Sequence, residues 1–498
     1  MTNSVSSASV GNMYKMSTGS SFPAILNSAF SRDRGSLDGP TIKKMNQVPV
    51  VARIEKCAAH FLVNSRSAAK HGAMYYCCVE VPFCATGRPR KVSIKPSTVP
   101  GYGLVQDQDT QGHMSAILSE VTPTPAERLL GHTTQGGWEV TELLRSAALN
   151  APGMTGANFS VGYKVNRNNP QTGGRETAFL KALDVDRALR SSTDLIGDLR
   201  GKLNEFAFER GMHEFCRDRH MSRVVRAIEA GDLMPNSLPG DRINQVPFLV
   251  LEIADQGDAR SWVNKISNVE TVLKLSYLHH VLTGLQQLHK ATVAHSDLKP
   301  SNVMIFRQDG AKIGDLGRVI NGAGNCPFTG NPYPGDYSYA PPEILYRAPQ
   351  SDWVNGRERI DLFQWGALCS YLFSGVELNT WLMSKLDVAV QPSLWGGNGP
   401  SYTMALPYLI DAFEKTLEEL GNDSFPAWAA DSLVALIRET AHPDYAQRGD
   451  ASVTKRTPNM TGLDRLITRV SILVKRADVQ VRVNDNATKA EKARSRNP

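Results

Sequence analysis

The stretch that decides the fold reads Val-Ala-His-Ser-Asp-Leu-Lys-Pro-Ser-Asn and runs from residue 293 to residue 302. It places a carboxylate, an ammonium group and an amide within six residues, at Asp297, Lys299 and Asn302. A carboxylate can accept the proton of a hydroxyl group, an amide oxygen can help to hold magnesium, and an ammonium group can offset charge on the transferred oxygens. The pattern predicts phosphoryl transfer, with Asp297 as the base, Lys299 as the cation that offsets charge on the transferred oxygens and Asn302 as a metal ligand.

The same stretch resembles the catalytic loop of Ser/Thr protein kinases, whose pattern is His-Arg-Asp-Leu-Lys-Pro-x-Asn. Ser296 stands where most members of that family carry Arg. Further along, Asp315 begins an Asp-Leu-Gly segment that resembles the family's Asp-Phe-Gly, whose Asp binds magnesium. The resemblance implies an α+β, bilobal protein-kinase-like fold with a small β-rich N-lobe, a larger α-helical C-lobe, and ATP bound between the two.

A candidate ATP-binding lysine, Lys181, lies in a predicted strand that loosely resembles the family's Val-Ala-Ile-Lys strand. In the family such a lysine contacts the phosphates of ATP and pairs with a glutamate of the next helix, predicted here over residues 203–226. Three glutamates lie on that helix: Glu205, Glu209 and Glu214. The sequence favours Glu209, because the run Val224-Val225 then follows at about the distance found in the family.

The loop that would cover the phosphates matches the family pattern Gly-x-Gly-x-x-Gly-x-Val only at Gly156 and Val161. Glycines there let backbone N–H groups approach phosphate oxygens, and the apolar residue can lie on the adenine. A rival loop over residues 131–137 is less well placed. The apolar strand after the helix resembles the hinge between kinase lobes, which implies that Leu251 guards the back of the nucleotide pocket and that Asp258 approaches the ribose.

Residues 335–343 resemble the end of kinase activation segments, Gly-Thr-x-x-Tyr-x-Ala-Pro-Glu. Asp336 stands at the Thr, where a carboxylate can pair with Lys299 but would repel Asp297 and raise its pKa if no cation intervenes. Ser296 removes the cation that usually receives a phosphate on this loop, so we expect activity without a phosphate switch. Five hydroxyl side chains remain candidate phosphorylation sites: Thr329, Tyr333, Tyr337, Ser338 and Tyr339.

Two further residues have predicted structural roles. Asp361 begins an apolar segment that resembles the Asp-x-Trp-Ser-x-Gly helix of kinases, and an acid there is expected to cap the helix and to hold the backbone of the catalytic loop. Arg448 follows a segment that loosely resembles the family's Asp-Pro-x-x-Arg. The resemblance implies a buried ion pair between Arg448 and Glu343.

The chain divides into four predicted parts. Residues 1–45 are Ser-rich, with few apolar residues in periodic order, and are expected to be disordered. Residues 46–122 contain strand-like segments of unknown role, and residues 122–125 form a predicted linker. The kinase-like region covers residues 137–455, and residues 456–498 hold a last helix and a basic tail.

Composition narrows the function classes. The formal net charge of +6 is mild, and much of it lies in the C-terminal tail, so a nucleic-acid partner is not expected. The seven cysteines have no metal-binding spacing, which fits reduced thiols in a cytoplasmic protein. No apolar run approaches the roughly 20 residues that span a bilayer. The Ser-rich start resembles the export signal of bacterial type III effectors, which implies delivery into a host cell as an alternative location.

The leading hypothesis is an ATP-dependent, magnesium-dependent kinase that transfers the γ-phosphoryl group to Ser or Thr of protein substrates. Lys299 favours Ser/Thr over Tyr, because Tyr kinases usually lack a lysine there. The alternative is a pseudokinase or scaffold that binds a partner protein, favoured by Asp336, Ser296 and the poor glycine loop. A small-molecule phosphotransferase is disfavoured by the Pro-Pro-Glu end of the activation segment. The sequence does not indicate the substrate.

Overall fold

The computed structural model describes residues 123–144, 160–190, 192–265, 271–328 and 330–494. The chain divides into two compact units, Met1–Gln106 and Asp107–Pro498, and every described residue belongs to the second. The expectations for residues 1–45 and for residues 46–122 lie outside the described residues.

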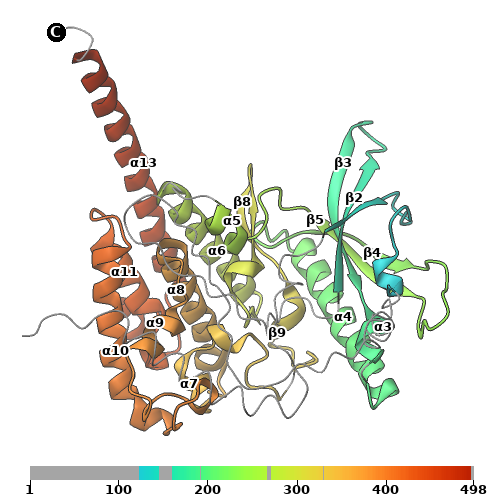
Figure 1. The fold of residues 1–498 in the computed structure, drawn as a ribbon. Coiled ribbons are helices and arrows are strands. Elements are labelled where there is room, and N and C mark those ends of the chain that lie inside the picture. The colour runs from blue at the N-terminus through green and yellow to red at the C-terminus, as the bar shows by residue number, and fades with distance from the viewer. Residues whose placement is uncertain (1–122, 145–159, 191, 266–270, 329, 495–498) are drawn as a thin grey trace, which may run out of the picture. The chain divides into compact units, whose positions relative to one another are not determined.

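A five-stranded antiparallel sheet occupies the first part of the described unit (Figure 1). Its strand order is β1-β2-β3-β5-β4. The bounds are Glu139–Leu144 for β1, Ser160–Asn168 for β2, Arg175–Leu183 for β3, Ala227–Leu233 for β4 and Val246–Glu252 for β5. Apolar side chains from one face of these strands form a core that includes Trp138, Tyr163 and Phe248, in keeping with alternating apolar residues along half-buried strands.

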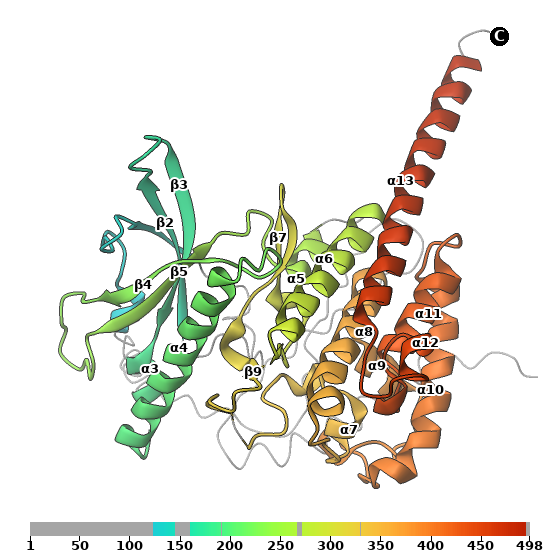
Figure 2. The same cartoon turned by 180° about the vertical axis from the view of Figure 1, so that it is seen from behind.

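Helix α4 (Leu195–Asp218) lies against the sheet (Figure 2). Its Phe206 joins a cluster with Leu249 and Leu251 of β5. The helix follows the short helix α3 (Val185–Arg190) and is capped by Asp194, whose side chain accepts from the N–H of Gly197.

The helix predicted over residues 203–226 therefore starts earlier and ends earlier than expected. Val224 and Val225 are extended instead, because the N–H of Val225 donates to the carbonyl of Ile313 at 2.8 Å and Val224 bridges the same residue. A β-branched pair that bonds a neighbouring strand cannot also continue the helix.

The second part of the described unit is mostly helical. Its helices are α5 (Ala259–Lys265), α6 (Thr271–Lys290), α7 (Pro342–Leu345), α8 (Arg359–Ser374), α9 (Leu378–Ser384), α10 (Tyr402–Asp423), α11 (Ala430–Thr440), α12 (Ala451–Thr454) and α13 (Leu463–Arg494). Helix α8 is buried along nearly its whole length, as its apolar sequence predicts for a central helix. The predicted α+β fold, with a β-rich part and a larger helical part, is confirmed.

Two short ladders frame the stretch 295–302. Strand β6 (Val293–Ala294) precedes it and pairs with β9 (Ile320–Asn321). Strand β7 (Val303–Phe306) follows it and pairs with β8 (Gly310–Ile313). Because both ladders are antiparallel, the chain turns back toward the stretch at each end, and the residues after β8 return beside it.

The packed region extends beyond residues 137–455 at both ends. Residues 123–125 do not form an exposed linker, because Thr124 is buried and its hydroxyl donates to Asp184 Oδ2 at 3.0 Å, and Ala126 and Leu129 belong to the core of the sheet. At the other end, α13 packs beside α6 through a buried apolar stripe, which runs through Leu466, Val470, Leu473 and Ala477. In the part of the chain that the structure describes, no helix is both long enough and apolar enough to cross a bilayer.

Candidate active site

Hydrogen bonds from α8 fix the backbone of the stretch 295–302. The carboxylate of Asp361 accepts from the N–H of His295 at 2.8 Å and from the N–H of Ser296 at 2.7 Å. It also contacts His289 Nε2 at 2.8 Å. Ser296 has φ of +62°, a backbone conformation that L residues rarely adopt, so these bonds hold a strained residue next to Asp297.

The predicted role of Asp361 was half right. Holding the loop backbone is confirmed, but capping its own helix is not. A π-helical turn, Val354–Glu358, runs directly into α8, so Asp361 does not lie at a free helix end. Its carboxylate is therefore available to the loop.

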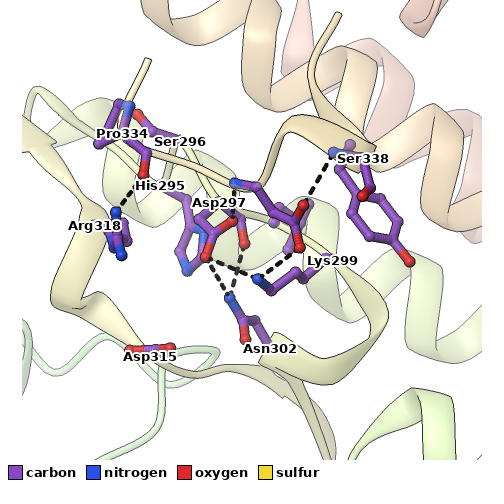
Figure 3. A network of polar contacts seen from close by, with 12 residues as sticks. His295, Ser296, Asp297, Lys299, Asn302, Asp315, Arg318, Pro334 and Ser338 are labelled. Carbon is purple, nitrogen blue, oxygen red and sulfur yellow. Dashed lines mark hydrogen bonds and ion pairs between the residues drawn. The ribbon is translucent and has the colours of Figure 1, made fainter. Parts of the chain in front are cut away.

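Asp297 is buried, and three groups hold its carboxylate. Oδ1 accepts from the N–H of Asp336 at 2.7 Å. Oδ2 lies 3.2 Å from Asn302 Nδ2 and 3.4 Å from Lys299 Nζ, and Figure 3 shows both nitrogens turned toward Asp297. Burial raises the pKa of this carboxyl, Lys299 opposes that rise, and Asp315 adds to it. The result is a more basic carboxylate than an exposed one.

Lys299 lies between two carboxylates. Its Nζ is 3.2 Å from Asp336 Oδ2 as well as 3.4 Å from Asp297 Oδ2. Burial would raise the pKa of Asp336, but Lys299 and the N–H of Ser338, which donates to Asp336 Oδ1 at 3.0 Å, lower it. Repulsion of Asp297 by Asp336 was expected only if no cation lay between them. Lys299 lies between the two carboxylates and offsets that repulsion.

A second charged group assembles around Lys181 of β3. Its Nζ lies 2.6 Å from Glu209 Oε1 on α4 and 3.3 Å from Asp315 Oδ1. Burial would lower the pKa of Lys181, but Asp315 and Glu209 together raise it, and Lys181 in turn holds the pKa of Asp315 well below its usual range. The predicted pairing of Lys181 with Glu209 is present in the structure.

The other two glutamates of α4 have different partners. Glu205 pairs with Lys202 and Glu214 lies 4.0 Å from Arg210, both on the surface of the helix. The choice among the three candidates therefore follows from which face of α4 packs on the sheet.

The two predicted metal ligands lie on the same side of Asp297. Asn302 uses its Nδ2 to bond Asp297, and Figure 3 shows its oxygen turned away from that residue, on the side of Asp315. The Asp315 carboxylate is about two-fifths exposed. Among the described residues no group of three or more His, Cys, Asp or Glu could hold a metal ion. Two oxygen donors fit magnesium, which is commonly bound by one or two protein oxygens together with phosphate oxygens and water.

The register of the sheet bears on the phosphate loop. Gly162 pairs with Leu144 on one side and with Lys181 on the other. Strand β1 therefore ends at Leu144, opposite the residue of β2 that pairs with Lys181, and Gly156 lies outside the described residues. The rival loop 131–137 adjoins the opposite end of β1, where Glu139 pairs with Asn166.

The remaining predicted nucleotide contacts lie around the same strands. Val161 is buried and pairs with Ala182, next to Lys181. Leu251 is buried in β5 opposite Phe179 of β3. The carboxylate of Asp258 accepts from the N–H and the hydroxyl of Ser261 at the start of α5. The nucleotide roles of these residues stay predictions.

The candidate phosphorylation sites differ in access. Tyr333 and Tyr339 are buried, whereas Tyr337 is 45% exposed and Ser338 is exposed. Thr329 lies outside the described residues. Of the described candidates, Tyr337 and Ser338 are therefore the accessible ones.

A buried ion pair joins the end of the activation segment to the helical core. Arg448 Nη1 and Nη2 each lie 2.7 Å from an oxygen of Glu343, and both side chains are almost fully buried. The predicted pair is confirmed. Its bidentate geometry is the strong form of an Arg–carboxylate contact.

The sequence analysis did not assign two residues to the site, although Gln364 stands at the Ser of the segment that resembles Asp-x-Trp-Ser-x-Gly and Tyr333 was a candidate phosphorylation site. Gln364 of α8 bonds the loop backbone on both sides of Asp297, and Tyr333 bonds Gln364 and the carbonyl of Asp336. The available signal was a single amide side chain in the otherwise apolar segment that follows Asp361.

Residues 199–385 match the family model described as the protein kinase domain. This segment of the chain is similar to protein kinase domains. The kinase match begins in α4 and ends after α9, so it includes Asp297 and Asp315 but not Lys181. The placement of Lys181 rests on the geometry alone.

Relatives of the domain include named Ser/Thr kinases. The chain is 31% identical over 122 residues to Aurora/IPL1-related protein kinase 2 of Caenorhabditis elegans, covering 24% of this chain and 37% of that protein. It is 26% identical over 194 residues to serine/threonine-protein kinase SSN3 of Scheffersomyces stipitis, covering 39% of each. It is 38% identical over 100 residues to inhibitor of nuclear factor kappa-B kinase subunit alpha of Gallus gallus, covering 19% and 12%. The matched part spans less than two fifths of each of these relatives.

Proposed function

We propose that this chain transfers the γ-phosphoryl group of ATP to Ser or Thr hydroxyls of protein substrates. The observation that carries the proposal is the Asp297 carboxylate, which is buried and held by Asp336 N–H, Asn302 and Lys299. A positioned carboxylate with a raised pKa is suited to orient a hydroxyl group and accept its proton.

Each charged residue then has one task. The hydroxyl oxygen of the substrate bonds to the γ-phosphorus, the bond from that phosphorus to the ADP oxygen breaks, and the hydroxyl proton passes to Asp297. Lys299 offsets negative charge on the transferred group. Lys181, oriented by Glu209, contacts the phosphates of ATP. Asn302 and Asp315 would hold magnesium, which supplies charge neutralisation for the phosphates.

The preference for Ser or Thr rests on Lys299, which lies two residues after the base. Its contacts with Asp297 and Asp336 keep an ammonium group at the place where charge develops on the transferred oxygens. The similarity to proteins named as Ser/Thr kinases supports the same preference.

The scaffold alternative is less well supported than before. It was favoured by Asp336, by Ser296 and by the poor match of the glycine loop, of which Gly156 lies outside the described residues. The charge of Asp336 is paired with Lys299, and the backbone at Ser296 is held by Asp361 without an arginine. Neither departure therefore weakens the catalytic geometry.

The direct test incubates the protein with magnesium, ATP labelled at the γ-phosphate and a generic protein substrate. Asp297→Asn keeps the size of the side chain but removes the base, so transfer should fall by about 10² to 10⁴-fold. The control is Asp411→Asn, which changes an exposed aspartate of α10. Equal transfer by wild type and Asp297→Asn would contradict the proposal, and label on tyrosine alone would contradict the Ser/Thr preference.

A further inference from the structure

We propose that Tyr333 and Gln364 are positioning residues that hold the Asp297 carboxylate in place in the unphosphorylated protein. They act through a closed ring of hydrogen bonds that joins α8, the catalytic loop and the activation segment. The expected effect on the reaction rate rests on the proposed phosphoryl transfer. The geometry of the ring rests on the hydrogen bonds alone.

Gln364 grips the loop on both sides of Asp297. Its Oε1 accepts from the N–H of Leu298 at 3.0 Å, and its Nε2 donates to the carbonyl of Ser296 at 3.2 Å. Gln364 is fully buried, and its neighbours along α8 are buried apolar residues. Because a buried amide makes bonds that no water replaces, these two contacts fix the backbone from which the Asp297 side chain projects.

Tyr333 connects this grip to the activation segment. Gln364 Nε2 donates to the Tyr333 hydroxyl at 2.9 Å, and that hydroxyl donates to the carbonyl of Asp336 at 2.9 Å. The N–H of Asp336 donates to Asp297 Oδ1 at 2.7 Å. The bonds thus return to Asp297, so one phenol hydroxyl couples residue 336 to the helix that holds the loop.

The activation segment passes close to the catalytic loop and to Tyr333 at Gly335. A Cβ atom added at Gly335 would lie 2.2 Å from the carbonyl oxygen of Ser296 and 2.8 Å from the Tyr333 hydroxyl. Both contacts are far shorter than real Cβ contacts, so a glycine is required at the point where the activation segment crosses the catalytic loop.

No phosphate enters the ring. Its links are a phenol, an amide and backbone groups, and they end on Asp297. Burial raises the pKa of Tyr333 well above its ordinary value, so the phenol remains protonated and able to donate. A segment held by neutral groups needs no modification to be ordered, in contrast to loops that are ordered by an Arg–phosphate pair.

The test compares Tyr333→Phe with Tyr346→Phe, both after phosphatase treatment. Tyr346 is a matched control because it is also a buried tyrosine whose hydroxyl donates to a backbone carbonyl, that of Val390, away from the loop. We expect kcat to fall about tenfold in Tyr333→Phe with the KM for ATP unchanged, and to stay at the wild-type value in Tyr346→Phe, while the two melting temperatures fall by similar amounts. Equal kcat in the two variants would overturn the inference.

Hydrogen exchange tests the ring without relying on activity. The amides of Asp336 and Leu298 should exchange faster in Tyr333→Phe than in wild type. In Tyr346→Phe their exchange rates should equal those of wild type. In a double-mutant cycle with Gln364→Ala, the two losses of kcat should be less than multiplicative, because both changes open the same ring. If Gln364→Ala does not fold, hydrogen exchange at Asp336 and Leu298 in Tyr333→Phe still tests whether the ring exists. Unchanged exchange at Asp336 would overturn the ring, whereas an inactive wild type with faster exchange in the variant would overturn only the proposed function.

Discussion

The catalytic loop and the lysine cluster hold their charges in different ways. In the loop, Asp297, Lys299 and Asn302 come from six consecutive residues, and buried side chains of α8 fix the backbone between them. In the cluster, Lys181 and Asp315 come from segments far apart in the chain. Lys181 is held there by ion pairs between side chains, with Asp315 and with Glu209.

The difference indicates that the catalytic loop is the rigid part of the site and that the lysine cluster can adjust. Buried backbone bonds cost free energy to break, so the loop is held even when no ligand is present. The side chains of Lys181 and Asp315 are partly exposed, so their contacts can exchange for contacts with phosphate or metal without a large change in stability. We expect substitutions in the loop's anchor to cost stability, and substitutions in the cluster to cost rate.

The largest expected effect is that of Asp361→Ala. The change leaves the N–H groups of His295 and Ser296 buried without an acceptor, so the free energy of unfolding should fall by about 3 to 5 kcal/mol. Urea denaturation measures the loss. The control is Asp431→Ala, since Asp431 lies in the first turn of α11 as Asp361 does in α8, but is exposed. A loss no larger than that of the control would remove the distinction between the two regions.

An intermediate effect is expected from Glu209→Gln. The change removes the charge that orients Lys181, while Asp315 remains as a partner, so transfer should fall about tenfold to a hundredfold. Glu209 is itself buried, but glutamine keeps its size and Asp315 remains as a partner of Lys181, so the free energy of unfolding should fall by less than in Asp361→Ala. Steady-state kinetics and urea denaturation measure the two quantities, and Glu205→Gln on the same helix is the control. A loss of stability as large as that of Asp361→Ala would show that the cluster is anchored like the loop.

The smallest effect is a shift of the pH profile in Lys299→Met. Asp297 must be deprotonated to accept a proton, and Lys299 lowers its pKa against the raising effects of burial and Asp315. Without the cation the pKa of Asp297 rises, so the acidic limb of the kcat/KM profile should move to higher pH, with a plateau reduced about tenfold or less. A limb that stays in place, or that moves to lower pH, would show that Lys299 does not act on Asp297.

Much of the loop could be predicted because its chemistry is local. Asp297, Lys299 and Asn302 are neighbours in the chain, and a motif of that length constrains their relative positions before any packing is known. The Glu343–Arg448 pair was also foreseen, although the two residues lie 105 positions apart, because each belongs to a segment with its own pattern.

Other parts of the site could not be predicted in the same way. Three glutamates of α4 have the same chemistry, and the sequence favoured Glu209 only by its distance from Val224-Val225, whereas the rotation of the helix against the sheet brings Glu209 to Lys181. Asp361 was expected to cap its own helix, yet the π-helical turn before α8 removes the free helix end. Gln364 stands at the Ser of the segment that resembles Asp-x-Trp-Ser-x-Gly, but that pattern does not predict its bond to Tyr333, which depends on what packs against each side chain.

By itself the sequence determined the set of reacting groups, their order along the chain and the α+β class. These follow from residue types at short spacing and from apolar periodicity, which are properties of the chain. The sequence favoured Glu209 for Lys181 and allowed a pair between Asp336 and Lys299, and only the tertiary structure showed that Lys299 lies between two carboxylates and that Gln364 and Tyr333 close a ring around the base. Those contacts join segments that lie tens of residues apart, and the packing of α8 and α4 brings them within hydrogen-bonding distance.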